Sequence, residues 1–357
     1  MTADITLRGP DEVIAVLPYQ LGYHPRNSVV AVALRGRSMG MVARTDLPPE
    51  EHAVEAAASL VGPLMRDGAT AVVVVAWEDA PDASTPVLLS LVEQLEEAGA
   101  EVVDVAVVRD GRRFSPICSE ACCPADGEPL RDPTTVPAVA DLVALGRAPL
   151  PSRDDVDRLV EPDGARDEGV ARAIAARADR RPGRRRWARA WGRLLEPGAG
   201  SDPPDDVVVA DAVLALADVG WRDGLIGWLS PGVLPSREVE PAVLALLRTS
   251  VPLWPTPARR APVVRTDHPA LLGRLLDVCR AVPDSCDGEA AAICTVAAHV
   301  AWADGEGAVA RAALERALRL VPDYRLADLL VRLVDGGVRF PRGPGRPHGD
   351  AGLRSVG

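Results

Sequence analysis

The chain contains no lysine and a single asparagine, Asn27, although it carries 40 basic residues among 357. Every one of these basic side chains is therefore an arginine. Such a bias, together with abundant Ala, Val, Pro and Gly, is typical of a GC-rich genome. Runs of arginine or alanine are for this reason weak evidence of function in this chain.

Aromatic side chains are also scarce, at 3% of the sequence, with two Phe and three Tyr. Proteins that bind single-stranded nucleic acid stack bases on aromatic rings, and this chain has few to offer. Its formal net charge is −11, whereas nucleic-acid binding needs a basic face that releases counterions. We therefore do not expect a nucleic-acid partner.

Long apolar runs are missing too, since no stretch reaches the ~18 residues needed to span a bilayer. The first residues, MTADITLRGPDEVIAV, have neither the basic region nor the apolar core of a signal peptide. We expect a cytoplasmic protein without a membrane partner. In that reducing compartment the six cysteines are expected to be thiols or metal ligands rather than disulfides.

The first 148 residues are predicted to form an α/β domain, a mixed sheet with covering helices, because β-branched runs alternate with helical patterns. The continuous valine run TAVVVVAW is typical of a central strand that is buried on both faces. Pro18 is expected to limit the first helix to about two turns. The predicted strands are 28–34, 41–45, 70–77 and 101–108. The predicted helices are 50–67, 86–98 and 136–145, together with the two-turn helix that opens the segment 10–21.

Beyond residue 148 the strand patterns disappear, and we predict an all-α helical domain at 207–340. A polar, arginine-rich linker with one helix is predicted at 149–206, and a disordered tail at 341–357. In the linker helix, Trp187 and Trp191 lie one turn apart, so one face is apolar and is expected to pack on the helical domain. The predicted helices are 207–219, 240–248, 269–282, 289–303, 308–320 and 325–334.

The segment 298–324 predicts a helical hairpin that turns at Gly305. Small and large residues then follow at the spacing of the second helix of a tetratricopeptide-type repeat: Ala310, Leu314, Ala317 and Pro322. Such hairpins stack into grooves that bind protein partners, so we predict a partner for the helical domain. Only one copy is evident, and an ordinary αα-hairpin stays an alternative.

Three cysteines, Cys118, Cys122 and Cys123, lie within six residues of the loop 114–130. Thiolates bind zinc or iron–sulfur clusters, although no second cysteine pair follows as in a zinc ribbon. A fourth ligand could come from His24, His52 or Asp126. A redox disulfide, a buried structural loop and a catalytic nucleophile are the other roles that stay open.

Charged side chains follow two of the predicted strands, and they form the second candidate site. Arg44 and Asp46 end the second strand, and Glu78 and Asp79 follow the valine run. Ligands collect at the carboxyl ends of strands in open α/β sheets, where carboxylates can hold Mg²⁺ or act as acid and base. The alternative is that these acids cap turns and helices.

His24, in the turn before the first strand, completes the candidate ligand-binding residues, with a surface position as its alternative. The sequence contains no Gly-x-Gly-x-x-Gly, no Walker loop and no Gly-x-Ser-x-Gly elbow. Neither nucleotide binding nor triad hydrolysis is therefore indicated by a motif.

Several segments, taken together, resemble a known family. They are PYQLGYHP at 18–25, SVV at 28–30, ARTDLP at 43–48, the cysteine loop with Gly127, and the hairpin from Ala301-Trp302 to Leu330. The chain resembles the actinobacterial family that carries the domain of unknown function numbered 4192. The resemblance implies a high-GC source and no particular activity. Tyr23 stands where members of that family commonly have Phe.

Two hypotheses of function follow. The first is a cytoplasmic interaction or regulatory module that uses the helical domain. The second is a metal- or thiol-dependent enzyme, or a small-molecule binder, that uses the strand-end carboxylates and the cysteine loop, with zinc as the candidate cofactor.

Overall fold

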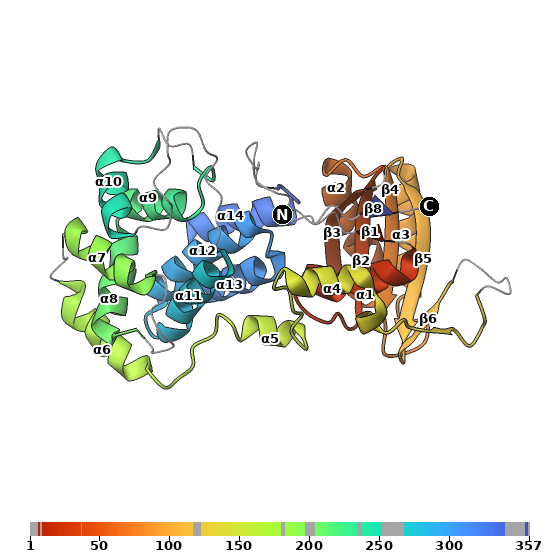
Figure 1. The fold of residues 1–357 in the computed structure, drawn as a ribbon, viewed down its shortest axis with the longest axis horizontal. Coiled ribbons are helices and arrows are strands. Elements are labelled where there is room, and N and C mark those ends of the chain that lie inside the picture. Colours follow the sequence, from red (N-terminus) through yellow and green to blue (C-terminus); the bar gives the residue numbers. More distant parts are fainter. Residues whose placement is uncertain are drawn as a thin grey trace. The chain divides into compact units, whose positions relative to one another are not determined.

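The computed structural model of the chain describes residues 6, 7, 9–36, 38–116, 123–179, 183–196, 204–234, 238–251, 268–339, 354 and 355. These residues form two compact units. The α/β unit takes the described residues of 1–155 and 335–338 with Arg354 and Ser355, and the helical unit takes those of 156–334 with Arg339. Figure 1 labels their elements.

A mixed sheet forms the middle of the α/β unit, as predicted. Its strand order over the described residues is β1-β8-β3-β2-β4-β5-β6-β7. The β2–β3 and β2–β4 pairs are antiparallel, and the β4–β5 pair is parallel. The strands are β1 (Thr6–Leu7), β2 (Ser28–Arg35), β3 (Ser38–Asp46), β4 (Ala71–Trp77), β5 (Glu101–Arg109), β6 (Arg112–Phe114), β7 (Glu128–Pro129) and β8 (Arg354–Ser355).

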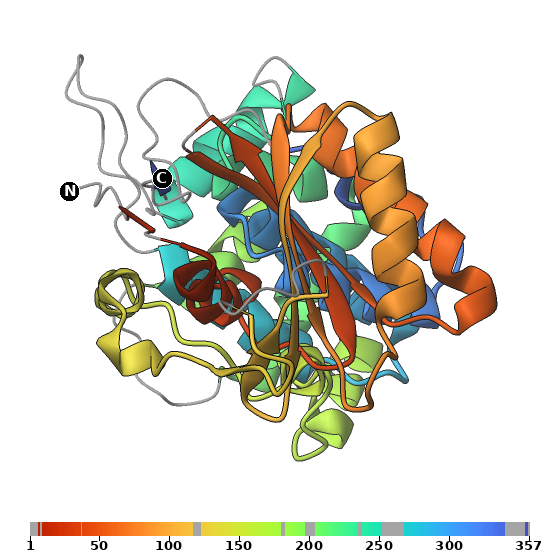
Figure 2. The same cartoon turned by 90° about the vertical axis from the view of Figure 1, so that its right-hand side faces the viewer.

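Helices cover both faces of this sheet, which explains the apolar character of its middle strands. On one face α1 (Pro10–Leu21) and α4 (Pro137–Ala144) pack on alternate residues of β2, β4 and β5. On the other face α2 (Ala53–Arg66) and α3 (Thr85–Glu97) pack on the remaining residues. In Figure 2 the orange α2 and α3 lie on one side of the strands, and the red α1 and yellow α4 on the other. The short 3₁₀ turns η1 (Glu50–His52) and η2 (Pro133–Thr135) precede α2 and α4.

The central position predicted for the valine run is confirmed. Strand β4 pairs with β2 on one side and β5 on the other, and Val72 to Ala76 are buried. Because successive side chains of a strand point to opposite faces, both cores draw on this one strand. Each face is apolar for that reason, and the run shows no alternation.

The expectation that Pro18 limits the first helix to two turns was wrong, since α1 runs for 12 residues to Leu21. Proline removes one backbone hydrogen bond inside a helix, at a cost of about 3 kcal/mol. Burial of Val16 and Leu17 against the sheet offsets that cost. The helix then ends at Gly22, which adopts a left-handed conformation with φ 82° and donates its N–H to the Pro18 carbonyl.

The helical unit contains helices only, over the residues that the structure describes. No helix in the described part of the chain has the length and apolar character needed to cross a membrane. The elements are α5 (Arg153–Asp157), α6 (Asp167–Ala178), α7 (Arg184–Leu194), α8 (Asp206–Leu214), η3 (Ala215–Ala217), α9 (Val219–Leu229), α10 (Pro241–Ser250), α11 (His268–Ala281), α12 (Asp287–Asp304), α13 (Gly307–Leu320) and α14 (Arg325–Asp335).

Over the described residues of 149–206, the predicted linker with one helix, the structure has helices α5, α6 and α7. The apolar face predicted around Trp187 and Trp191 is buried. The indole N–H of Trp191 donates to the Ala212 carbonyl at 3.1 Å, so α7 packs on α8. Helix α6 also buries one side, with Val170, Ala173 and Ile174, which sequence patterns did not single out.

The predicted helical hairpin is present as α12 and α13. Gly305 ends α12 in a left-handed conformation with φ 86°, which is the backbone geometry that favours glycine at a helix end. Whether this pair belongs to the tetratricopeptide type stays a prediction. In the tail that was predicted to be disordered, Arg354 and Ser355 pair with β1, which needs backbone groups and no apolar side chains.

Candidate functional site

The predicted strand-end residues all lie at one edge of the sheet. Strand β2 begins there at Ser28, which lies opposite Asp46, the last residue of β3, and opposite Trp77, the last residue of β4. Strand β5 ends beside them at Arg109. The pleat of the sheet then divides these residues, because alternate side chains point to opposite faces.

Glu78 belongs to the face that α2 and α3 cover, and its carboxylate is fully occupied. Ser84 donates its backbone N–H (2.9 Å) and its hydroxyl (2.6 Å) to Oε2. Arg109 donates from Nη1 to Oε1 at 2.6 Å. Since Ser84 is the N-cap residue of α3, the Glu78 carboxylate lies where a helix N-terminus attracts an anion. Glu78 is 5% exposed and acts as an internal counter-ion.

Asp79 lies at the surface of the same edge and pairs with Asn27. The Asn27 side chain donates from Nδ2 to Asp79 Oδ2 at 2.6 Å, and its Oδ1 accepts the Asp79 N–H at 2.9 Å. Asn27 adopts a left-handed conformation with φ 38°, which asparagine tolerates better than most residues. These two hydrogen bonds join the start of β2 to the end of β4, so the Asp79 carboxylate stabilises a turn.

Arg44 and Asp46 belong to the opposite face, which α1 and α4 cover. The Arg44 guanidinium donates from Nη2 to Asp46 Oδ1. The Arg44 side chain is 14% exposed and that of Asp46 is 79% exposed, so the ion pair leads from the interior to the surface. The ring of Tyr23, which is buried, lies 5.8 Å from the guanidinium carbon.

Ser28 shares this face with Arg44, as the register shows. Val30 lies opposite Arg44 on β3, and Ser28 is two residues before Val30. Ser28 is fully buried. Neither its hydroxyl nor Nε of Arg44 has a hydrogen-bond partner among the described residues. Ser28 and Arg44 are thus diagonal neighbours on adjacent strands, and each has a buried donor without an acceptor. Such a donor lowers the free energy of unfolding by about 1–3 kcal/mol.

An acceptor-rich group would satisfy both of these atoms. Arginine binds carboxylate and phosphate oxygens through two parallel hydrogen bonds, and a serine hydroxyl adds a third donor. Sequence patterns alone singled out Arg44 and missed Ser28 as a site residue. The available signal was a single hydroxyl at the head of the apolar run SVVAVAL.

His24 does not join this group through its side chain, which is exposed. Its backbone N–H donates to the Leu150 carbonyl at 3.0 Å, and Leu150 in turn donates to the Gly22 carbonyl at 2.8 Å. The turn containing His24 is therefore held by backbone bonds. Those bonds also place Tyr23 beside Arg44.

The cysteine cluster lies mostly outside the described residues, since only Cys123 is among them, and it is half-buried. Cys118 and Cys122, with the metal and redox roles predicted for them, stay predictions. Of the other suggested ligands, His52 lies in η1 and Asp126 pairs with Arg112 at 3.7 Å. Within the part of the chain that the structure describes, no group of three His, Cys, Asp or Glu side chains is arranged to hold a metal ion.

These features define a two-unit protein, in which a mixed α/β sheet with a polar strand-end edge is followed by a helical unit. The chain belongs to the family described as a domain of unknown function, DUF4192, whose model matches residues 10–340. The family match thus spans both units. No curated protein matches the chain, and no solved structure matches it.

Proposed function

We propose that this protein binds a small ligand at the sheet edge formed by Ser28, Arg44 and Asp46. The part of the ligand that binds there is an anionic group rich in hydrogen-bond acceptors. One observation carries the proposal. The Ser28 hydroxyl and Arg44 Nε are buried side by side on one face of the sheet and lack partners among the described residues. A buried polar group without a hydrogen-bond partner destabilises the folded protein, and a ligand that supplies the partner removes this cost.

Charge supports an anion as the bound group. The guanidinium of Arg44 is always protonated, and its side chain lies mostly out of water. Among the described residues its ion-pair partner is Asp46, whose side chain is largely exposed and can rotate into solvent. A carboxylate or phosphate that replaces Asp46 gains the same charge-assisted bonds and adds a bond from Ser28.

Neighbouring residues support a defined ligand position rather than a diffuse surface charge. The buried Tyr23 ring lies against the Arg44 guanidinium, and Trp77 lies across from Ser28 on β4. Strands and packed rings hold side chains more rigidly than loops do. We place this binding activity in the cytoplasm, because Cys279, Cys286 and Cys294 are free thiols, which suits a reducing compartment.

A thermal-shift screen of the full chain tests the proposal. The probes are inorganic phosphate, sugar phosphates, nucleotides and dicarboxylates. We expect at least one probe to raise the melting temperature, since a ligand at 100 times its Kd stabilises the folded state by about 2.7 kcal/mol. Arg44→Met should weaken binding of that probe at least tenfold, or about 1.4 kcal/mol.

Two further variants make the test specific. Asp46→Asn removes the competing carboxylate and should strengthen binding of the anion several-fold, the opposite direction from Arg44→Met. Arg26→Met changes an exposed arginine near the same edge and should leave the affinity within twofold. A probe whose binding survives Arg44→Met, or a screen without any shift up to 10 mM, would overturn the proposal.

A further inference from the structure

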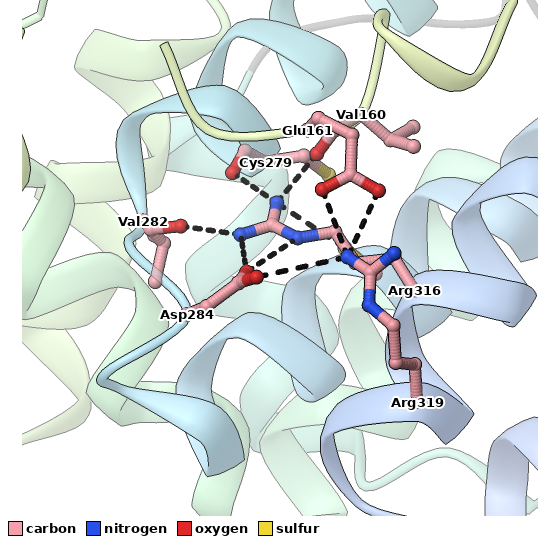
Figure 3. A network of polar contacts seen from close by, with 8 residues as sticks. Val160, Glu161, Cys279, Val282, Asp284, Arg316 and Arg319 are labelled. Carbon is pink, nitrogen blue, oxygen red and sulfur yellow. Dashed lines mark hydrogen bonds and ion pairs between the residues drawn. The ribbon is translucent and has the colours of Figure 1, made fainter. Parts of the chain in front are cut away.

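Arg316, on α13 of the helical unit, is a fully buried cation that holds several segments together. Its side chain is 1% exposed. It donates from Nη1 to the Cys279 carbonyl at 2.7 Å and from Nη2 to the Val282 carbonyl at 2.6 Å. Asp284 accepts from Nε at 3.0 Å and from Nη2 at 2.8 Å. Figure 3 shows the carbonyls and this carboxylate gathered around the guanidinium.

Arg319, one turn further along α13, extends the same network toward the surface. It donates to both carboxylate oxygens of Glu161, at 2.9 and 2.8 Å, and lies 3.6 Å from Asp284 Oδ2. Figure 3 shows both arginines sharing Asp284. Two guanidinium groups thus meet two carboxylates, Glu161 and Asp284, in one network.

Two cysteine thiols lie against Arg316. Cys279 lies in the last turn of α11, Cys294 lies in the middle of α12, and both are 0% exposed. The same nitrogen that binds the Cys279 carbonyl, Nη1, lies 3.8 Å from Cys294 Sγ and donates to it. One guanidinium nitrogen of Arg316 thus contacts both cysteines, Cys279 through its carbonyl oxygen and Cys294 through its sulfur, and the two thiols are neighbours.

These contacts shift the pKa values of the two thiols in opposite directions. The hydrogen bond from Cys279 and the nearby Arg316 charge hold the pKa of Cys294 below its ordinary value, although burial opposes them. The same hydrogen bond, together with burial, raises the pKa of Cys279. Because the Arg316 N–H that contacts Cys294 Sγ would stabilise a negative charge on that sulfur, Cys294 is the sulfur that we expect to attack an oxidant.

Cys286, between these two cysteines in the sequence, provides a contrast. It is half-buried at the start of α12, and burial followed by the charge of Glu289 raises its pKa. Exposure alone would make Cys286 more reactive than the other two. The local charge predicts the reverse.

We propose that Cys279 and Cys294 form a redox-active dithiol, which a hydroperoxide converts to a disulfide between α11 and α12. The Cys294 sulfur attacks the distal oxygen of the hydroperoxide, the O–O bond breaks, and Cys294 becomes a sulfenic acid. The leaving oxygen takes the proton that Cys294 gave up and departs as an alcohol, or as water from hydrogen peroxide.

The Cys279 sulfur then attacks the sulfenic sulfur. The S–S bond forms, the S–O bond breaks, and the hydroxyl leaves as water with the Cys279 proton. In sum, two thiols are oxidised and one hydroperoxide is reduced. Since neither sulfur is exposed, the oxidant reaches Cys294 only when α11 and α12 part locally, so the dithiol responds to sustained rather than brief oxidation.

Peptide mapping of the full chain after hydrogen peroxide treatment under native conditions tests this proposal. We expect a peptide containing Cys279 joined to one containing Cys294, which disappears on reduction. The oxidised protein should melt several degrees higher than the reduced protein, because the new bond closes a loop of the unfolded chain. Cys286→Ser should form the same disulfide at an unchanged rate.

Two variants resolve the individual steps. In Cys279→Ser the reaction should stop at the sulfenic acid of Cys294, which a 1,3-diketone reagent traps. In Arg316→Lys trapping should slow at least fivefold, and a circular-dichroism melt shows whether that variant is folded. If Cys279 and Cys294 both stay reduced in the native protein while Cys286 is oxidised, the proposal is overturned, whatever the folding of Arg316→Lys.

Discussion

Buried polar side chains in this chain follow two patterns: some have partners within the chain, and others have none among the described residues. Glu78 and Arg316 are surrounded by groups of the chain that satisfy them. Ser28 and Arg44 Nε, in contrast, have no partner among the described residues. Both patterns contain charged or polar residues in apolar surroundings, so the residue type alone does not distinguish them. Only the partners do.

His299 is a third buried polar residue, and its state predicts a pH dependence of stability. It lies on α12, is 7% exposed, and both ring nitrogens lack hydrogen-bond partners among the described residues. Burial, followed by the positive charge of Arg222, lowers its pKa from 6.5 to about 4. The folded protein therefore keeps this imidazole neutral in mildly acidic solution, whereas the unfolded chain protonates it.

Because the folded pKa of His299 is depressed, its contribution is lost as the pH falls from 6.5 towards about 4. The unfolded chain binds the extra proton in that window, so the free energy of unfolding should fall by about 2 kcal/mol between pH 7 and pH 5 on this account. Urea denaturation at several pH values checks this. In His299→Phe the fall should be smaller by that amount, and an unchanged pH profile would contradict the assignment.

At the scale of elements, the composition of helix α9 hid it from pattern analysis. Helix α9 contains three glycines, which lower helix propensity. A Cβ at Gly224 would lie 2.5 Å from Val243 Cγ1, so this glycine lets α10 pack closely on α9. Asp218 begins the helix by accepting the Trp221 N–H at 2.9 Å. Tertiary packing outweighs intrinsic propensity here.

Helix α7 was predicted as a linker helix with an apolar face, and its packing predicts large effects of mutation. Trp191 is fully buried, so Trp191→Ala should destabilise the helical unit by about 3–5 kcal/mol. Trp191→Phe keeps most of the packing and loses the bond to the Ala212 carbonyl, at about 1 kcal/mol. Denaturant titration measures both, and exposed Arg189→Gln serves as the control. A change below 1 kcal/mol in Trp191→Ala would show that α7 is a linker after all.

At the scale of the whole molecule, the α/β unit is discontinuous in sequence. Its first 155 residues are joined by residues 335–338, which follow most of the helical unit in the chain. Arg66 donates from Nε to the Gly336 carbonyl at 2.7 Å, which ties this returning segment to α2. The family model, over residues 10–340, includes the returning segment as well. The protein partner predicted for the helical part stays a prediction.

Gly337, in the returning segment 335–338, packs closely against Pro63 and Met41. Replacing it tests how much this segment contributes to the stability of the α/β unit. Gly337 has φ 64°, and a Cβ there would lie 2.6 Å from Pro63 Cβ and 2.9 Å from Met41 Cε. Gly337→Ala should therefore cost about 2 kcal/mol or more and speed hydrogen exchange in peptides from β3 and α2. Gly146→Ala, with φ 79° but open space around the new methyl, should cost about 1 kcal/mol. Equal effects of the two variants would rule out the close contact.

Local sequence determined which segments become strands and helices in most of this protein. The β-branched run at 71–77 cannot be accommodated except between two other strands, and Pro10 with Asp11 and Glu12 begins α1 as such residues do elsewhere. The position of Arg44 and Asp46 at a strand end also indicated them as candidate ligand-binding residues, because ligands bind at the ends of strands in α/β sheets. These are short-range properties, and neighbouring residues suffice to express them.

Only the tertiary structure decided how those residues divide. The pleat sends Glu78 to one face, where Ser84 and Arg109 satisfy it. It sends the Ser28 hydroxyl and Arg44 Nε to the other face, where they have no hydrogen-bond partner among the described residues. The pairing of Cys279 with Cys294 beside Arg316 likewise depends on three helices meeting. Hydrogen bonding and burial depend on distances between segments far apart in sequence, and those distances exist only once the chain has folded.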